Sequence, residues 1–223
     1  MTDNIDKYNK GNATVKNGAD DQKSDKTDNL ENNIEDNERK MVDVIIPTYR
    51  PAKEFGELLH RLEKQEYRPN RILVMNTGKE YWNSEWENYP LLEVHHLDQK
   101  DFDHGGTRKR AAELSTADIM VFMTQDALPA DRKMIGNLVR AVSRNSGTGA
   151  AYARQLPKAD CRFLERYTRS FNYPEQSSVK SLPDVETYGI KTYFCSNVCA
   201  AYDREIYQKI GGFVNRAIFN DDM

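Results

Sequence analysis

The chain has 223 residues, of which 30% are charged and 38% hydrophobic, and its formal net charge is −3. Its composition changes at about residue 41. The first 40 residues contain ten acidic, seven basic and about eight hydrophobic side chains, and so little apolar surface does not offset the entropy of ordering a chain. We therefore expect residues 1–40 to form a disordered polar tail and residues 41–223 to form one domain.

The charge balance and the apolar runs exclude two classes of protein. From Met41 onward the acidic and basic residues are equal in number, 25 of each, whereas a general nucleic-acid-binding surface needs a marked basic excess. No apolar stretch approaches the 18 or so residues that span a bilayer, and the N-terminus lacks the basic start and apolar core of a signal peptide. We expect no partner nucleic acid, no membrane span and a cytoplasmic location.

Hydrophobic patterning predicts alternating strands and helices in the first part of the domain. Strands are predicted at 42–46, 71–75, 91–97 and 119–123, and helices at 51–62, 107–115 and 134–142. Pro47 is expected to stop the first of these strands. This alternation is typical of an α/β protein with a mostly parallel sheet covered by helices. The second part is less regular, with strands expected at 150–154 and within 194–202, and helices at 163–171 and 204–210. Gly211-Gly212 should end the last helix.

A single carboxylate follows the most apolar strand. Ile119–Met123 is apolar throughout, and Asp126 comes three residues later, before Pro129. Open α/β sheets bind ligands beyond the carboxyl ends of their strands, which favours Asp126 as a ligand-binding group. Asp is also a common helix N-cap, and Ala130 begins a helical pattern. Spacing alone does not decide between the two interpretations.

Two other segments could hold a nucleotide. Pro47-Thr48-Tyr49-Arg50 ends the first strand, where backbone N–H groups, a hydroxyl and an aromatic ring could bind a base and ribose; an ordinary strand-to-helix turn is the alternative. In His104-Gly105-Gly106-Thr107-Arg108, the glycines allow a close approach of backbone to a diphosphate, and Arg108 offers charge. A tight turn with a solvated arginine is the alternative there.

Further polar residues have less specific patterns. Asp221-Asp222 could supply a general base next to a bound metal or nucleotide, although a terminal acidic pair is usually only solvated. His95 and His96 alternate along a predicted strand, so only one of them can face a pocket. We interpret both histidines as structural.

Taken in order, the motifs resemble family-two glycosyltransferases with the GT-A fold, and more narrowly bacterial rhamnosyltransferases. The resemblance covers essentially all of 41–223. The matching segments are Val44-Ile45-Ile46-Pro47-Thr48-Tyr49, Val74-Met75-Asn76-Thr77-Gly78, Phe102-Asp103-His104-Gly105-Gly106-Thr107-Arg108, Thr124-Gln125-Asp126-Ala127-Leu128-Pro129, Arg154-Gln155-Leu156-Pro157, Phe171-Asn172-Tyr173-Pro174, Cys195-Ser196-Asn197, and Gly211-Gly212-Phe213 through Asn220-Asp221-Asp222-Met223.

The resemblance implies a role for each site residue. The nucleotide-sugar-binding set is Pro47, Thr48, Tyr49, Asn76, Thr77, Arg108, Gln125 and Asp126. Within it, Arg108 would face the diphosphate, and Asp126 would hold Mg²⁺ or Mn²⁺ against the two phosphates. Asp222, with Asp221 as the alternative, would activate the acceptor hydroxyl in an inverting single displacement.

The resemblance also implies substrates, and this chain departs from the family pattern in two ways. Asn76-Thr77 stands where the family has an aspartate-rich turn, and Gln125 precedes a single aspartate instead of a pair, a reduced pattern that the rhamnosyltransferase-like members share. The acidic pair normally begins an acceptor-side helical region, so the chain looks C-terminally truncated.

The expected donor is dTDP-rhamnose, and the expected acceptor is a bacterial surface glycan or lipid-linked glycan, which leaves peripheral association with the inner face of the membrane open. A transferase that uses a UDP-sugar and a non-catalytic nucleotide-binding fragment are the alternatives.

Overall fold

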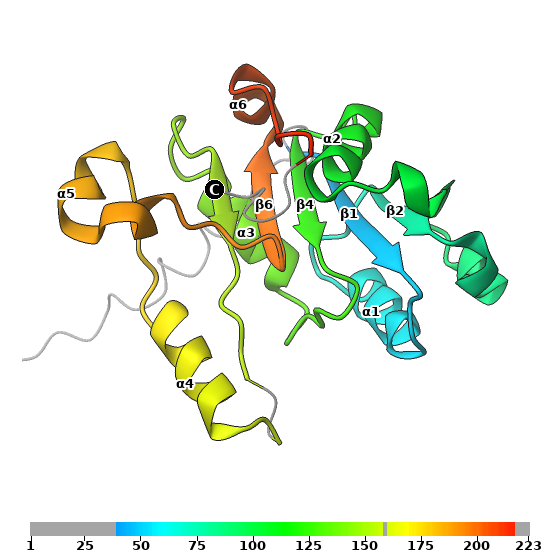
Figure 1. The fold of residues 1–223 in the computed structure, drawn as a ribbon. Coiled ribbons are helices and arrows are strands. Elements are labelled where there is room, and N and C mark those ends of the chain that lie inside the picture. The colour runs from blue at the N-terminus through cyan, green and yellow to red at the C-terminus, as the bar shows by residue number, and fades with distance from the viewer. Residues whose placement is uncertain (1–38, 158–159, 217–223) are drawn as a thin grey trace, which may run out of the picture. The chain divides into compact units, whose positions relative to one another are not determined.

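The protein is described by a computed structural model that covers residues 39–157 and 160–216. Its centre is a six-stranded sheet with the order β3-β2-β1-β4-β6-β5 (Figure 1). Strands β1 to β4 are parallel, whereas β6 runs antiparallel to both of its neighbours. The expected α/β fold with a mostly parallel sheet is confirmed. The strands are β1 Val42–Tyr49, β2 Arg71–Thr77, β3 Leu92–Leu97, β4 Ile119–Met123, β5 Ala150–Tyr152 and β6 Cys199–Asp203.

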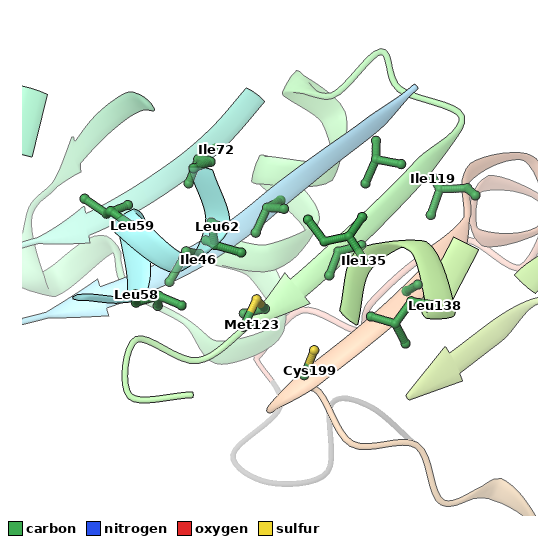
Figure 2. Packing of buried hydrophobic residues seen from close by; sticks show 14 of the residues in the cluster. Ile46, Leu58, Leu59, Leu62, Ile72, Ile119, Met123, Ile135, Leu138 and Cys199 are labelled. Carbon is green, nitrogen blue, oxygen red and sulfur yellow. The ribbon is translucent and has the colours of Figure 1, made fainter. Parts of the chain in front are cut away.

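Helices cover both faces of the sheet and form two apolar cores. Helices α1 (Glu54–Glu63) and α3 (Met134–Val142) pack on one face, and α2 (His104–Leu114) and α6 (Arg204–Lys209) contribute to the core on the other. Figure 2 shows the first core, in which α1 and α3 residues meet those of β1, β2, β4 and β6. Because side chains alternate along a strand, Ile46 enters this core and Ile45 enters the other.

The prediction that Pro47 stops the first strand was wrong, because β1 continues to Tyr49. Pro47 pairs with Met75 of β2, but the ladder between β1 and β4 has already ended at Ile45 and Phe122. At Pro47 the strand therefore has only one paired neighbour. A residue without a backbone N–H is tolerated where one side of a strand is unpaired, and this extension carries Thr48 and Tyr49 to the edge of the sheet.

Helix α2 begins at His104, three residues before the predicted start. The Asp103 side chain caps it by accepting a hydrogen bond from Gly106 N–H at 2.6 Å. The two glycines lie in the first turn of the helix rather than in a loop before it. An Asp N-cap stabilises such a start by satisfying a backbone N–H that has no partner within the helix.

The segment between β5 and β6 leaves and re-enters the sheet at one edge. Tyr152 near the end of β5 pairs with Ala200 of β6, and Cys199 at the start of β6 pairs with Met123 at the end of β4. The intervening segment includes α4 (Phe163–Asn172) and the short α5 (Val185–Tyr188). The strand expected within 194–202 begins only at Cys199. Gly211 and Gly212, just after α6, have φ of +89° and +69°, which confirms the expected helix end.

No helix in the described ranges is long and apolar enough to span a bilayer.

Candidate functional site

Several of the sequence-predicted residues, Pro47, Thr48, Tyr49, Gln125 and Asp126, lie where the order of the sheet reverses. After β1 the chain adds β2 and β3 on one side and then returns to add β4 on the other side of β1. The carboxyl ends of β1 and β4 therefore flank a topological switch point, the position at which open α/β sheets bind ligands. Figure 1 shows that β1 and β4 end at the same edge of the sheet. Tyr49 is the last residue of β1, and Asp126 follows the last residue of β4 by three positions.

A chain of hydrogen bonds connects three neighbouring strands at this edge. The Thr48 hydroxyl donates to Asn76 Oδ1 at 2.9 Å, and Asn76 Nδ2 lies 3.0 Å from His96 Nδ1. Asn76 is fully buried, and Thr48 is 2% exposed. An amide that donates to His96 Nδ1 requires that nitrogen to be unprotonated. We call this pair of side-chain hydrogen bonds the Thr48–Asn76–His96 relay. It fixes the ends of β1, β2 and β3 relative to one another.

His96 is a site residue that the sequence interpretation missed. The register pairs Asn76 with His96, and His96 lines a cleft of about 280 Å³ together with Tyr49, Gly78, Lys79, Glu80, Leu97, Asp98 and Gln99. Strand alternation allowed at most one of the two histidines to face a pocket, and the interpretation of both as structural was wrong for His96, which lines the cleft. Burial, and then the charge of Lys79, lowers the pKa of His96 from its ordinary value. Its neutral form is the one that fits the relay.

An aromatic and cationic cluster lies around Tyr49, which lines the cleft. The Arg50 guanidinium lies 4.3 Å from the Tyr81 ring centre and 5.1 Å from that of Tyr49, and it donates to the Tyr81 hydroxyl at 2.8 Å. Tyr49 is 40% exposed, so its ring is accessible to a ligand. Arg50 has φ of +48°, which is uncommon for a residue with a side chain. Arg50 and Tyr81 were not among the predicted site residues, because their contact joins segments 31 residues apart.

Gln125 connects the end of β4 to the end of β1. Its Oε1 accepts a hydrogen bond from Tyr49 N–H at 2.9 Å, and its Nε2 donates to the Tyr49 carbonyl at 3.1 Å. Thr77, the other predicted residue on this side, has a buried Oγ1 without a hydrogen-bond partner in the described part of the chain.

Asp126 is exposed and has no hydrogen bond or ion pair with the described residues. The alternative interpretation as a helix N-cap was wrong, because α3 begins only at Met134 and its N-cap position is Lys133. The described residues contain no group of three or more His, Cys, Asp or Glu side chains that could hold a metal. A lone accessible carboxylate nevertheless suits Mg²⁺ or Mn²⁺ bound mainly by phosphate and water oxygens.

Arg108 lies on α2, where it is 8% exposed, and its Nη1 donates to the His104 carbonyl at 2.9 Å. It is therefore not the solvated arginine of the alternative interpretation. A Cβ at Gly106 would lie 2.5 Å from Asp103 Oδ2. The space left by this glycine is filled by the capping carboxylate, so its absent side chain serves the helix start rather than a ligand.

The second half of the chain forms a polar cluster from three of the sequence motifs. Gln155 Nε2 donates to the Tyr173 hydroxyl at 2.5 Å and to Ser196 Oγ at 2.9 Å, and Arg169 donates to Gln155 Oε1. A cleft of about 500 Å³ lies beside this cluster, lined by Gln155, Arg162, Leu164, Glu165, Thr168, Arg169, Asn172 and Tyr173. Thr124 N–H donates to the Val198 carbonyl at 3.2 Å, so the returning segment lies next to the turn that carries Asp126.

Asp221 and Asp222 lie outside the described residues. The described chain ends at Arg216, whose backbone N–H donates to Asp103 Oδ2 at 2.9 Å. This contact brings Arg216, the last described residue, to the start of α2.

Solved structures in complex with nucleotide sugars have a similar fold. A mannosyltransferase from Pyrobaculum calidifontis, in complex with GDP-Man and Mn²⁺, superposes with a TM-score of 0.56 at 21% identity, over 82% of this chain and 50% of that one. S. aureus TarS in complex with UDP-GlcNAc gives a TM-score of 0.55 at 16% identity, over 82% of this chain and 51% of that one. At such identities the likeness establishes the GT-A-like fold alone.

Proteins with similar sequences identify the family more closely than the fold does. The O-antigen chain rhamnosyltransferase RfbN of Salmonella typhimurium is 38% identical over 189 residues, and WbaN of Salmonella anatum, also an O-antigen chain rhamnosyltransferase, is 30% identical over 182 residues. The alignments cover 82% and 81% of this chain and 58% of each relative. Residues 43–211 match the glycosyl transferase family 2. The chain therefore belongs to glycosyl transferase family 2.

Proposed function

We propose that this chain is the donor-binding and catalytic part of an inverting rhamnosyltransferase that moves L-rhamnose from dTDP-rhamnose onto a bacterial surface glycan. One observation carries the proposal. Asp126, an exposed carboxylate with no hydrogen bond or ion pair to the described residues, lies at the switch point next to a cleft lined by Tyr49 and His96. The names of the two Salmonella relatives support the choice of sugar.

The donor nucleotide would enter the cleft on the β1–β3 side of Asp126. At about 280 Å³, this cleft is near the lower end of ligand-pocket volumes, which suits a base and ribose rather than a whole nucleotide sugar. Tyr49 offers an exposed ring for stacking, and His96, which is held by its contact with Asn76, lines the cleft beside it. The diphosphate would then extend toward Asp126, with Arg108 as a second source of positive charge.

Asp126 is the residue that would hold Mg²⁺ or Mn²⁺. A bound cation would stabilise the negative charge that develops on the leaving nucleoside diphosphate. Asp126 contributes a hard oxygen ligand without having to break an existing contact, because it has no partner among the described residues. Gln125 contributes no charge, so the cation would depend on phosphate oxygens and water for its other ligands.

The acceptor would approach from the opposite side of Asp126. The segment between β5 and β6 starts and ends at the same edge of the sheet as the donor cleft, and this segment contains the residues that line the 500 Å³ cleft beside Gln155 and Arg169. Its amide, hydroxyl, carboxylate and guanidinium groups are the kinds that hydrogen-bond to sugar hydroxyls. Beside it, α4 exposes Phe163, Leu164, Tyr167 and Phe171. An apolar helical face suits the lipid of a lipid-linked acceptor, and peripheral contact with the cytoplasmic face of a membrane would follow.

The proposed reaction is a single displacement. The acceptor hydroxyl oxygen forms a bond to C1 of the sugar as the bond from C1 to the diphosphate oxygen breaks, so the configuration at C1 inverts. The hydroxyl proton passes to Asp222, the proposed general base, and the electron pair leaves with the diphosphate. Asp222→Asn should reduce transfer by roughly a hundredfold while leaving donor affinity unchanged. Near-native transfer by this variant would point to Asp221 instead.

Nucleotide binding tests the donor assignment. Calorimetry with dTDP, UDP and GDP, each with and without Mn²⁺, should show the tightest metal-dependent binding for dTDP. Asp126→Asn should weaken the metal-dependent binding by more than about tenfold and leave the melting temperature nearly unchanged, since the Asp126 side chain has no structural contact. Asp131→Asn is the matched control, because Asn can still accept the hydrogen bond from Lys133 N–H.

The results also separate the alternatives. Preference for UDP would favour a transferase of UDP-sugars; one structure with a similar fold is in complex with UDP-GlcNAc. Binding without sugar transfer, tested in a protein as long as the Salmonella relatives, would favour a non-catalytic nucleotide-binding role. Equal dTDP–Mn²⁺ affinity in wild type and Asp126→Asn would remove the metal assignment.

A further inference from the structure

The Gln125 carboxamide makes hydrogen bonds to the backbone of β1 beyond the point where the main-chain pairing of β1 with β4 ends. Strands β1 and β4 pair only as far as Ile45 and Phe122, yet β1 continues to Tyr49. Gln125 supplies one acceptor and one donor to the N–H and C=O of Tyr49, at 2.9 and 3.1 Å. A neighbouring strand would offer Tyr49 the same pair of groups. We call this contact the Gln125–Tyr49 amide pair.

Few side chains could make this contact. A carboxamide carries a donor and an acceptor on one planar group, whereas a carboxylate has no donor at neutral pH. Glutamate at this position could accept from Tyr49 N–H but would place its second oxygen against the Tyr49 carbonyl. Asparagine has both groups on a side chain one methylene shorter. Glutamine therefore combines the required reach with the required donor and acceptor.

The amide pair connects the two halves of the proposed donor site. On one side it holds the peptide between Tyr49 and Arg50, directly before a residue with φ of +48° that carries the guanidinium between two tyrosine rings. On the other side, Gln125 and Asp126 are the central residues of a turn closed by Ala127 N–H and the Thr124 carbonyl at 3.2 Å. The amide pair thereby fixes the position of the Tyr49–Arg50 segment relative to the turn that carries Asp126.

We propose that Gln125 is a positioning residue, which holds the Tyr49 backbone and the Asp126 turn in register and does not itself contact the donor. The proposal rests on the proposed function, in that this edge of the sheet binds a nucleotide diphosphate. It replaces the expectation from the family resemblance that Gln125 belongs to the nucleotide-binding set. Both of its polar atoms are turned toward the backbone of β1.

Two substitutions separate positioning from direct contact. Gln125→Ala removes the amide pair, and Gln125→Glu keeps the size but replaces the donor with an oxygen. Gln208→Ala, on the exposed surface of α6, is the control. The hydrogen-exchange rate of the Tyr49 amide, measured by NMR, reports whether the amide pair is formed. Calorimetry with dTDP and Mn²⁺ measures the affinity of the donor site.

Positioning predicts a specific set of results. Tyr49 amide exchange should be about tenfold faster in Gln125→Ala than in wild type and unchanged in Gln208→Ala, an effect in the range of one or two net hydrogen bonds. Affinity for dTDP–Mn²⁺ should fall by about tenfold in both Gln125 variants. A residue that contacts ribose directly would behave differently, since the carboxylate of Gln125→Glu can accept from ribose hydroxyls and would keep the affinity.

Two outcomes would overturn the proposal: unchanged Tyr49 exchange in Gln125→Ala, or native or tighter dTDP–Mn²⁺ binding by Gln125→Glu. Failure of the wild-type protein to bind any nucleotide would instead count against the proposed function. Tyr49 exchange would still decide whether the amide pair holds the backbone.

Discussion

We expect Asn76→Ala to lower the free energy of unfolding by about 3 kcal/mol. The Asn76 side chain is fully buried and contacts Thr48 Oγ1 at 2.9 Å and His96 Nδ1 at 3.0 Å, with a longer contact of 3.4 Å to the Gly78 carbonyl. Alanine leaves the Thr48 hydroxyl buried without a partner and removes the donor to His96. Each buried polar group left unsatisfied costs about 1–3 kcal/mol, and the lower part of that range for two groups gives the estimate.

Thermal and urea unfolding measure this effect. In a domain of this size, 1 kcal/mol shifts the melting temperature by about 2–4 °C, so Asn76→Ala should melt about 6–12 °C below wild type. Thr77→Val is the matched control one residue away. Thr77 Oγ1 is buried without a partner in the described ranges, so valine should cost no stability. A loss below about 1 kcal/mol in Asn76→Ala would refute the relay as a structural element.

Two further predictions concern pH and the chain start. Burial, and then Lys79, lowers the pKa of His96 below 6.5, so the folded state favours neutral His96; the free energy of unfolding should fall as the pH drops below 6.5 until it has passed the lowered pKa. His96→Gln should flatten this dependence in urea titrations from pH 7.5 to 5, and a wild-type protein that gains stability over this range would contradict the assignment. A chain that starts at Arg39 should melt like wild type, because residues 1–38 hold few apolar side chains. Starting at Met41 removes the contact of the Lys40 carbonyl with the Tyr67 hydroxyl at 2.6 Å and should cost about 1 kcal/mol; a drop of many degrees in the Arg39 form would show that the tail contributes to folding.

The elements that sequence patterning predicted best are those whose environment is uniform. Ile119–Met123 is apolar throughout because both faces of β4 are buried, and the strand has the predicted ends. Helix α3 matches its prediction for a related reason, since Ile135, Leu138 and Val142 repeat at helical spacing and all enter one core. In both cases the signal is carried by neighbouring residues, and no distant contact is needed to interpret it.

The parts of the site that escaped prediction depend on residues distant in sequence. The Gln125–Tyr49 amide pair joins residues 76 positions apart, and the Thr48–Asn76 contact joins residues 28 apart. Which histidine faces the cleft depended on the register of β2 and β3. A sequence pattern placed these residues at strand ends, but only the order and register of the strands determine which of them meet.

The start of α2 was mispredicted for a different reason, because the residue that caps this helix could be recognised in the sequence. Asp103 is a favoured N-cap residue, but Gly105 and Gly106 suggested a ligand-binding or tight turn, so the helix was predicted to start at Thr107. A Cβ at Gly106 would lie 2.5 Å from Asp103 Oδ2, so a side chain there would require the capping carboxylate to move. The same carboxylate oxygen accepts from Gly106 N–H and Arg216 N–H, so it also connects α2 to the end of the described chain.

This arrangement predicts opposite effects for two Gly→Ala substitutions in helices. Gly106→Ala should displace the Asp103 carboxylate, remove the cap and release Arg216, at a cost of about 1–3 kcal/mol. Gly136→Ala in α3 meets only Tyr67 Cβ at 3.5 Å, an ordinary contact, and should stabilise the protein by up to about 1 kcal/mol through helix propensity. Urea unfolding of both variants compares the two effects at once. If Gly106→Ala were as stable as Gly136→Ala, the glycine would not be needed for the cap. A close approach of the α2 backbone to a bound diphosphate would then again be the better explanation for Gly106.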